Sequence, residues 1–390
     1  MSVEVLSLGC RLNLSESEEL RALLADCNDI VVVNSCAVTG EAVRQTRQAI
    51  RRARKARPDA RLLVTGCAAE VERKAIAAMP EVDGIVANAA KLDPRSWNAP
   101  APSVRPKTAH TRAFVQVQNG CDHACTFCVI PQGRGPGRSL SAAEVTASIA
   151  RQVEAGVGEI VLTGVDLTSW GTDLPGTPRL GKLVETILAA VPDLPRLRLS
   201  SLDGVEIDDC LFELLTSETR VMPHVHLSLQ SGHDMILKRM KRRHSRGDAV
   251  RLVERLRARR PDIAIGADLI AGFPTEDAAM HAANVSIVRE LAIVLGHVFP
   301  YSPRPGTPAA RMPQVPVATV RERAAELRGA VATERAAWQL ALLGKPLMVL
   351  AERDGTGHAE NFARVRLPAG TQPGQLVTLV PTRIDEGLLA

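Results

Sequence analysis

A repeated strand–loop–helix pattern runs through most of the chain, and it limits the fold to a parallel α/β architecture. In the first hundred residues, short apolar runs at 3–8, 30–33, 62–65 and 84–87 predict strands. The segments between them carry helical signals. Because alternating strands and helices form parallel sheets covered by helices, we predict a doubly wound sheet for an N-terminal domain, residues 1–95.

Three helices are expected in this domain. Ser15 precedes Glu18 by three residues, the spacing of a capping box, and predicts the start of the first helix. Residues 44–57 hold seven Lys/Arg and no acid, and predict a basic second helix. Residues 70–79 predict a third.

A second β/α series follows a segment rich in Pro, Ala and Ser, residues 96–108, which predicts a linker. The strands expected in this series are 113–118, 159–163, 196–200, 224–229, 263–270 and 293–299. Six β/α units are fewer than a closed barrel needs, so residues 109–343 predict a partial (β/α)6 barrel, ended by a helix over 320–343. Short alternating runs in the tail predict a small all-β domain, residues 344–390.

Three cysteines lie within eight residues at the carboxyl end of the first strand of this series. Cys121, Cys125 and Cys128 have the spacing Cys-x3-Cys-x2-Cys. Three soft thiolates suit iron or zinc, and a four-iron cube held by three cysteines keeps one iron open to another ligand. A zinc site with a distant fourth ligand, or three unrelated thiols, would also fit the spacing alone.

This spacing, with Phe127 before the last cysteine, resembles the radical S-adenosylmethionine (SAM) superfamily. The resemblance implies that the open iron binds SAM and that an electron from the cluster splits the sulfonium. The resulting 5′-deoxyadenosyl radical then removes a hydrogen atom from the substrate. The cofactor supplies the hard chemistry, and the protein supplies geometry and excludes water.

A second group of cysteines is dispersed in the sequence. Cys10, Cys36 and Cys67 each follow one of the first three predicted strands. In a parallel sheet these loops share one edge, so the three thiols are expected to meet and hold a second cluster. Chance placement of buried cysteines is the alternative, and it is the preferred interpretation for Cys27 and Cys210, which lie in helical contexts.

The two groups together resemble the methylthiotransferases, which have an N-terminal domain with three cysteines, a radical SAM core and a C-terminal TRAM domain. Residues 8–13 (Leu-Gly-Cys-Arg-Leu-Asn), 34–39 (Asn-Ser-Cys-Ala-Val-Thr) and 297–309 look most like the branch that acts on threonylcarbamoyladenosine in tRNA. The isopentenyladenosine branch usually has Gln-Met after the first cysteine, and the ribosomal-protein aspartate branch Pro-Lys. Neither pair is found here.

The resemblance implies two 4Fe–4S clusters and SAM as cofactors. The first cluster, on Cys121, Cys125 and Cys128, generates the radical that removes the hydrogen from carbon 2 of the modified adenine. The second, on Cys10, Cys36 and Cys67, presents sulfur, and a second SAM supplies the methyl group. The expected partners are the tRNA anticodon loop, a sulfur donor and a reducing protein such as flavodoxin or ferredoxin.

Other strand-end segments fit supporting roles in cofactor binding. Their candidate residues are Gly164, Asp166, Gln230, Asp268 and Gly272. Glycine after a strand allows a cofactor to approach the backbone, although it is more often simply part of a turn. Arg134 and Arg138, after the cluster loop, are candidates for contacts with phosphate or the cofactor, or are surface arginines.

Charge and hydropathy limit the remaining possibilities. The net charge is +5, and residues 238–260 form a second basic stretch, so an anionic partner is compatible. The chain has no apolar run of about 18 residues and no secretory signal pattern at its start, which predicts a cytoplasmic protein without membrane spans. In the tail, Phe362 is the only aromatic residue, so we expect electrostatic contact with RNA there more than base stacking.

Three functions remain to be distinguished: a tRNA methylthiotransferase, the same chemistry on a ribosomal protein side chain, and a metal-bound RNA-binding module without catalysis. An isopentenyladenosine substrate is a further alternative within the first. Brown colour under anaerobic conditions separates the enzymes from a zinc module.

Overall fold

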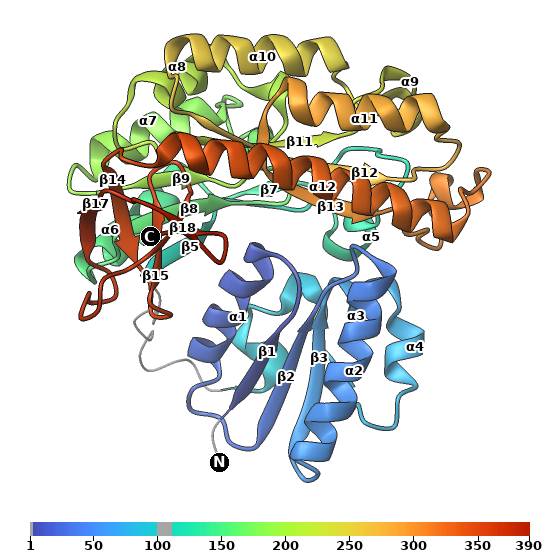
Figure 1. Cartoon of the computed structure of the whole chain (residues 1–390). Helices are drawn as coiled ribbons and strands as arrows, with labels where there is room; N and C mark the ends of the chain where they lie inside the picture. The colour runs from blue at the N-terminus through green and yellow to red at the C-terminus, as the bar shows by residue number, and fades with distance from the viewer. Residues whose placement is uncertain (1–2, 100–110) are drawn as a thin grey trace. The chain divides into compact units, whose positions relative to one another are not determined.

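The computed structural model describes residues 3–99 and 111–390, and its internal contacts divide the chain into two compact units (Figure 1). The first unit comprises residues 1–108, 118–138 and 302–310, as far as these are described. The second comprises 109–117, 139–301 and 311–390.

The first unit is a four-stranded parallel sheet in the order β1-β2-β3-β4, as predicted. Its strands are β1 (Glu4–Ser7), β2 (Ile30–Ser35), β3 (Arg61–Gly66) and β4 (Gly84–Ile85). Its α-helices are α1 (Arg11–Leu23), α2 (Gly40–Ala56), α3 (Cys67–Val71), α4 (Arg73–Ala77) and α5 (Ile130–Arg134). A two-residue strand, β6 (Gln118–Asn119), precedes the loop of three cysteines.

Both faces of this sheet are buried. In β2, Val31 and Val33 pack in one apolar cluster, while Ile30 and Val32 pack in the other, together with Leu20 of α1. Since successive side chains of a strand point to opposite faces, this alternation requires cover on both sides. The doubly wound arrangement expected from the sequence is therefore confirmed.

Two helix predictions in this unit were wrong in their boundaries. Helix α1 starts after Cys10, whose extended backbone occupies the N-cap, and Ser15 is a buried residue inside the helix. The single helix expected over 70–79 is interrupted at Glu72, whose backbone (φ −120°, ψ 33°) leaves the helical region. The capping-box spacing at Ser15 was misleading because the first turn begins directly at the strand-end cysteine.

The segment before the undescribed residues packs onto the sheet. Trp97 is 2% exposed, and its indole Nε1–H donates to the Lys91 carbonyl at 2.7 Å. The packed part of this unit therefore extends at least to Ala99. The remainder of the predicted linker, from residue 100, lies outside the described residues up to 110.

The second unit holds the six β/α repeats expected from the sequence. One parallel sheet contains β5 (Arg112–Gln116), β8 (Glu159–Thr163) and β9 (Leu197–Leu199); the other contains β10 (Ser201–Leu202), β11 (His224–Gln230), β12 (Ala264–Ala271) and β13 (Ile293–Pro300). A parallel bridge between Leu197 and Val221 joins the β9 segment to the chain leading into β11. The partial parallel barrel is thereby confirmed.

Helices cover one face of these strands (Figure 1). They are α6 (Ala142–Glu154), α7 (Leu180–Ala190), α8 (Asp209–Ser217), α10 (Arg246–Arg259), α11 (Ala278–Glu290) and α12 (Val317–Leu342), with the short α9 (Asp234–Arg239) after β11. In β12, Ile265, Ala267 and Leu269 belong to the core shared with the helices. The alternate residues Gly266 and Asp268 therefore face the opposite, inner side of the sheet.

The tail folds into an all-β sheet in the order β17-β14-β15-β16-β19-β18. Its strands are β14 (Leu347–Ala351), β15 (Thr356–Ala359), β16 (Arg364–Arg366), β17 (Leu376–Leu379), β18 (Ile384–Asp385) and β19 (Leu388–Leu389). The Phe362 ring stacks on His224 of β11 with centroids 4.9 Å apart, and the Arg198 guanidinium lies 4.7 Å from it. This ring therefore packs against other residues of the second unit.

Among the described residues, no helix combines the length and the apolar composition that crossing a membrane would require.

Candidate functional site

The loop that carries Cys121, Cys125 and Cys128 joins β6 to α5 in the first unit. Gly120 opens it with φ +74°, and a Cβ at this position would lie 1.9 Å from the Pro136 carbonyl oxygen. Only glycine allows this close approach of two backbone segments. The Cys121 N–H then donates to the Gly135 carbonyl at 3.2 Å, which closes the base of the loop.

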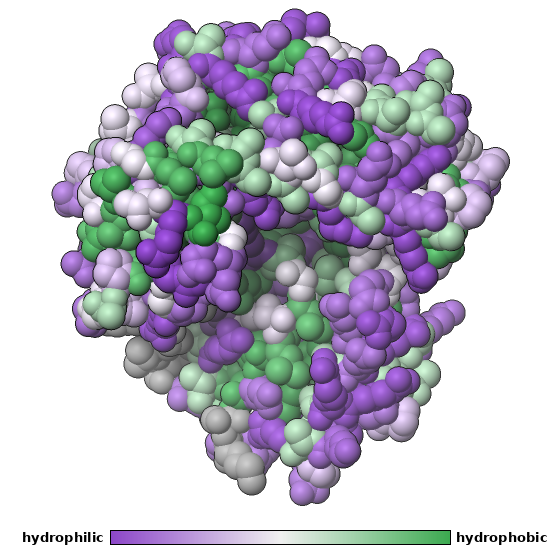
Figure 2. Space-filling view, in the orientation of Figure 1, coloured by the Kyte–Doolittle hydropathy of each residue, from purple (hydrophilic) through white to green (hydrophobic). Residues whose placement is uncertain are grey.

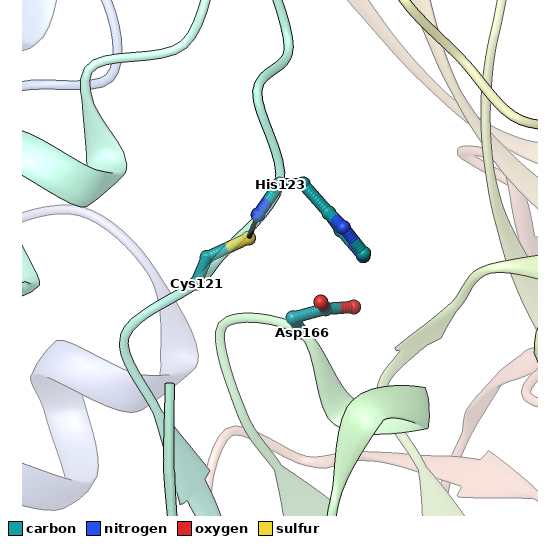
Figure 3. A group of neighbouring side chains, drawn as sticks. All are labelled: Cys121, His123 and Asp166. Carbon is teal, nitrogen blue, oxygen red and sulfur yellow. Dashed lines mark hydrogen bonds between the residues drawn. The ribbon is translucent and has the colours of Figure 1, made fainter. Parts of the chain in front are cut away.

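Backbone N–H groups point at two of the three sulfurs. The His123 N–H donates to Cys121 Sγ at 3.4 Å (Figure 3), and the Ile130 N–H donates to Cys128 Sγ at the same distance. All three thiols are partly exposed, and none of the eight cysteines, all of which lie in described segments, forms a disulfide. Three reduced thiols on one short loop, with donors that stabilise thiolate sulfur, fit a cluster with three cysteine ligands.

Cys10, Cys36 and Cys67 follow β1, β2 and β3 at one edge of the parallel sheet. The register pairs Ser7 with Asn34 and Ser35 with Gly66, so the three strands end level with one another. The loops therefore present their cysteines side by side, as the sequence predicted from strand ends alone.

The packing and electrostatics of these thiols indicate that they are neighbours. A Cβ on Gly9 would lie 2.8 Å from Cys36 Sγ, so the Cys10 loop runs directly against Cys36. The pKa of the Cys36 thiol is raised to about 11, mainly by burial and in smaller part by the charges of Cys10 and Cys67. Burial also raises the pKa of Cys67, against the opposing effect of Arg134 and Lys91.

Such thiols stay protonated until a metal ion replaces the proton, since coordination deprotonates a thiol outright. The donor set of Cys10, Cys36 and Cys67 therefore fits a second metal cluster.

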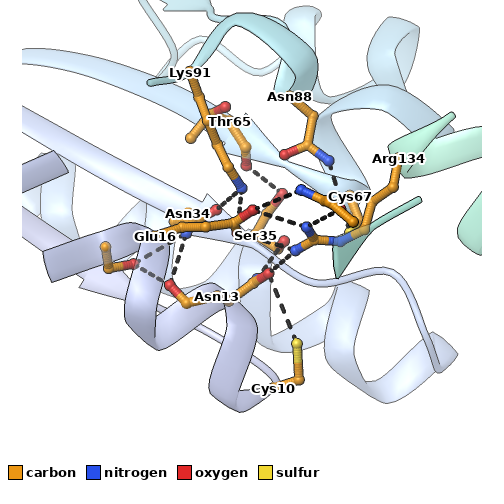
Figure 4. A network of polar contacts seen from close by, with 12 residues as sticks. Cys10, Asn13, Glu16, Asn34, Ser35, Thr65, Cys67, Asn88, Lys91 and Arg134 are labelled. Atoms are coloured by element: carbon orange, nitrogen blue, oxygen red, sulfur yellow. Dashed lines mark hydrogen bonds and ion pairs between the residues drawn. The ribbon is translucent and has the colours of Figure 1, made fainter. Parts of the chain in front are cut away.

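A buried polar network lies beneath this edge (Figure 4). Glu16 of α1 is 1% exposed and accepts from Arg134 at 2.8 and 3.0 Å and from the Lys91 ammonium. Burial opposes the ionisation of Glu16, yet Arg134 and Lys91 together hold the pKa of its carboxyl below the ordinary value. One carboxylate thus lies between two buried cations.

Arg134, predicted from the sequence to be either a phosphate or cofactor contact or a surface arginine, is buried in this network, so the surface interpretation is wrong. Besides Glu16, it donates to Asn13 Oδ1 at 2.5 Å and to Asn119 Oδ1 at 2.9 Å. Arg134 comes from α5, directly after the loop of three cysteines, whereas Asn13 follows Cys10. This single side chain therefore ties the two cysteine groups together within one unit.

Two asparagines complete the connection. Asn13 Nδ2 donates to the carbonyls of Leu8 and Ser35 at 2.7 and 2.9 Å, which holds the loops of Cys10 and Cys36 together. Asn88 Nδ2 donates to the Gly133 carbonyl at 2.6 Å and lies 3.9 Å from Cys67 Sγ. A Cβ on Gly133 would lie 3.2 Å from the Cys67 Cβ, so α5 packs closely against the third cysteine.

We predict that Glu16→Ala destabilises the chain by about 3–5 kcal/mol, because it leaves two buried cations without their counter-charge. The measurement is the shift of the urea unfolding midpoint. Glu41→Ala is the control, because the Glu41–Arg44 ion pair is exposed and its loss should leave the midpoint unchanged. Equal midpoints for the wild type and Glu16→Ala would contradict the assigned role of Glu16.

Gly66 places Cys67 at the edge of the sheet. Its φ is +90°, and a Cβ would lie 2.4 Å from the Ser35 carbonyl oxygen. We predict that Gly66→Ala costs about 1–3 kcal/mol more in unfolding free energy than Gly156→Ala, because of these two glycines Gly66 alone combines a positive φ with a clash. Gly156 has φ +86° and nothing within 4 Å of its added Cβ. Similar losses for the two variants would refute the close contact.

The predicted cofactor residues outside the cysteine loops lie in the second unit, at or near strand ends. Gly164 and Asp166 follow β8, and Asp166, also drawn in Figure 3, accepts from the Ser169 hydroxyl at 2.8 Å. Gln230 ends β11 with φ +67°. Gly272 follows β12 with φ +69°, and a Cβ there would lie 2.6 Å from Val320 of α12, which gives this glycine a packing role as well.

Asp268 lies on the inner side of β12 between two histidines of neighbouring strands. Its Oδ1 is 3.1 Å from His226 Nε2 and 3.1 Å from His297 Nδ1. Burial opposes ionisation, but these hydrogen bonds hold the pKa of Asp268 well below its usual range. The strand sequence predicted Asp268 as a cofactor residue and missed both histidines, because their neighbourhood depends on the register of three strands.

Profiles of two known families match the chain. Residues 2–87 match Uncharacterized protein family UPF0004, and residues 115–283 match the Radical SAM superfamily. The first match contains Cys10, Cys36 and Cys67, and the second contains Cys121, Cys125 and Cys128.

Two curated relatives cover nearly the whole chain. Threonylcarbamoyladenosine tRNA methylthiotransferase MtaB of Rickettsia prowazekii is 43% identical over 404 residues, which span 99% of this chain and 96% of the relative. The tRNA-2-methylthio-N(6)-dimethylallyladenosine synthase of Cereibacter sphaeroides is 33% identical over 415 residues, 96% of this chain and 94% of the relative.

Solved structures share the fold at low sequence identity. The radical SAM methyltransferase TsrM from Kitasatospora setae, with cobalamin and a 4Fe–4S cluster bound, has a TM-score of 0.53 at 16% identity, over 72% of this chain and 66% of that one. The cobalamin-dependent radical SAM enzyme OxsB has a TM-score of 0.51 at 10% identity, over 85% and 56%. These likenesses show the fold alone.

Proposed function

Since the chain belongs to the methylthiotransferase family of radical SAM enzymes, we propose that it adds a methylthio group to carbon 2 of threonylcarbamoyladenosine in tRNA. The observation that carries the substrate is the identity of 43% over almost the full length to a threonylcarbamoyladenosine tRNA methylthiotransferase. The sequence motifs of residues 8–13 and 34–39 favour the same branch.

The donor sets fit two 4Fe–4S clusters and SAM. We assign Cys121, Cys125 and Cys128 to one cluster and Cys10, Cys36 and Cys67 to the other. When bound, the first cluster would supply the electron that cleaves SAM, and the second would supply the sulfur for transfer. The count of two rests on the grouping of six reduced thiols into two sets of three.

The chain's own residues then hold geometry and charge. Gly120 and Gly66 fix the backbone on which each set of cysteines is carried, and the N–H groups of His123 and Ile130 stabilise thiolate sulfur. Arg134 couples the two loops through Glu16 and Asn13. A backbone and a hydrogen-bond network that fix the cysteines also fix the groups bound to them. Transfer of a group from one bound molecule to another requires such fixed positions.

Several finer assignments belong to the same proposal. Gly164, Asp166, Gln230, Asp268 and Gly272 would line the SAM site at the strand ends of the second unit. The all-β tail, residues 344–390, would act as a TRAM-like RNA-binding domain. A reducing protein such as flavodoxin or ferredoxin and a separate sulfur donor would serve the enzyme in the cytoplasm.

Nucleoside analysis of tRNA tests the proposal. In a strain lacking the gene, mass spectrometry should show threonylcarbamoyladenosine without its 2-methylthio derivative, and the intact gene should restore the derivative. Unchanged levels of methylthio-threonylcarbamoyladenosine would overturn the assigned substrate. Loss of the methylthio derivative of dimethylallyladenosine instead would move the chain to the other tRNA branch.

A further inference from the structure

Helix α2 carries a row of arginines on one side. Arg44, Arg47 and Arg51 are spaced by three and four residues and therefore lie on one stripe of the helix. At 1.5 Å of rise per residue, this stripe is about 10 Å long. The surface over α2 is strongly hydrophilic in Figure 2.

This stripe forms one wall of a cavity of about 400 Å³ within the first unit. The cavity, which we call the arginine pocket, is lined by Arg44, Arg47, Gln48, Arg51, Glu72 and Arg304. Arg304 comes from residues 302–310, a segment that the sequence motif singled out and that the cysteine chemistry does not use. The Gly40 N–H donates to the Ser302 hydroxyl at 3.0 Å, which anchors this segment to the start of α2.

Glu72 aligns two of the guanidinium groups. Its Oε2 accepts from Arg47 at 2.6 Å and its Oε1 from Arg304 at 3.2 Å. Two cations therefore share one carboxylate inside the pocket. Two further acids form ion pairs at the rim of the pocket: Glu41 with Arg44, and Glu81 with Arg51 at 3.8 Å. Both arginine side chains are exposed, so these ion pairs are weak.

Arg304 supplies an independent indication of a ligand. It is 3% exposed, and its Nε is buried without a hydrogen-bond partner. A buried guanidinium donor without an acceptor is unusual, because it forgoes its hydration without compensation. Because Arg304 lines the pocket, an oxyanion bound there would give this guanidinium a further acceptor.

We propose that the arginine pocket binds backbone phosphates of the RNA substrate. Planar guanidinium groups match phosphate oxygens in pairs, and a nucleic acid offers such an anion at every nucleotide. This inference rests on the proposed function for its choice of RNA. It assigns to the first unit, which holds both sets of cysteines, a direct contact with the tRNA in addition to that of the tail.

The test compares two charge reversals in the full-length holoenzyme. Arg51→Glu changes an exposed wall of the pocket, and Lys74→Glu makes the same change of charge at an exposed position on α4 of the same unit. The probe is tRNA from the deletion strain, with its dissociation constant measured over a series of salt concentrations. We expect Arg51→Glu to weaken binding about tenfold and to reduce the slope of log K against log salt by about one.

The wild type is assayed for methylthio product with the same tRNA, which separates the two proposals. A loss confined to Arg51→Glu, with a raised KM for tRNA, supports the pocket. Equal losses of tRNA binding in both variants, or no loss in either, overturn the arginine pocket as an RNA site. If the wild-type protein still forms methylthio product in that case, the proposed function stands. A loss for Arg51→Glu without any wild-type product supports the pocket and refutes the function. Weaker binding of an acidic electron-donor protein, with tRNA binding intact, also overturns the inference.

Discussion

The Cys36→Ala variant is expected to cleave SAM but to form methylthio product at least about 100-fold more slowly than the wild type. Mutating a residue that only hydrogen-bonds to a metal ligand costs about 10–100-fold, and the loss of the ligand itself should cost more. The reason is the division of the six thiols. Cys36 lies against Gly9 and among Cys10 and Cys67, whereas Cys121, Cys125 and Cys128 occupy a separate loop with its own backbone support. Removing a ligand from one set leaves the other set complete.

Two measurements on the same samples check this expectation: 5′-deoxyadenosine from SAM, by chromatography, and methylthio nucleoside, by mass spectrometry. Cys27→Ala is the matched control, since Cys27 is a partly buried cysteine of the same unit outside both sets. It should retain both activities. If Cys36→Ala formed as much methylthio nucleoside as the wild type, the assignment of sulfur transfer to Cys10, Cys36 and Cys67 would be wrong.

Cys125→Ala is expected to abolish both activities. A cube with three protein ligands keeps one open iron, and the loss of one of those ligands leaves too few to hold it. Cleavage of SAM should fall by at least about 1000-fold, because the hard chemistry belongs to the cofactor. The loop itself should persist, since its base is closed by Gly120 and the Cys121–Gly135 backbone bond.

The readout for Cys125→Ala is 5′-deoxyadenosine formation with a strong chemical reductant, which removes any dependence on the electron donor. Cys210→Ala serves as the control and should cleave SAM normally, because Cys210 is an exposed cysteine on α8 and not the core residue predicted from the sequence. SAM cleavage by Cys125→Ala above about a tenth of the wild-type rate would contradict the assigned ligand set.

The architecture was predictable because its signals are local. Strand β8 was predicted at its observed bounds, since its three apolar residues, 160–162, lie between the turn residues Gly158 and Gly164. Cys121, Cys125 and Cys128 form a motif readable from spacing alone. The convergence of Cys10, Cys36 and Cys67 needed one further step, the rule that parallel strands end at a common edge.

What the sequence did not reveal depends on contacts between distant residues. Glu16 and Arg134 are 118 positions apart, and neither the acid in α1 nor the arginine after the cysteine loop is unusual where it stands. The surface interpretation of Arg134 was therefore wrong, because the side chain is buried. The histidines beside Asp268 were missed for the same reason, because three strands must be in register before His226 and His297 meet one carboxylate.

The central claim is that two separate sets of three thiolates hold two clusters. Iron and acid-labile sulfide per chain, measured after anaerobic reconstitution, test it most directly when the wild type is compared with the variant carrying Cys10→Ala, Cys36→Ala and Cys67→Ala. Two cubes predict about eight irons in the wild type and about four in the triple variant. The same iron content in both proteins would contradict the account.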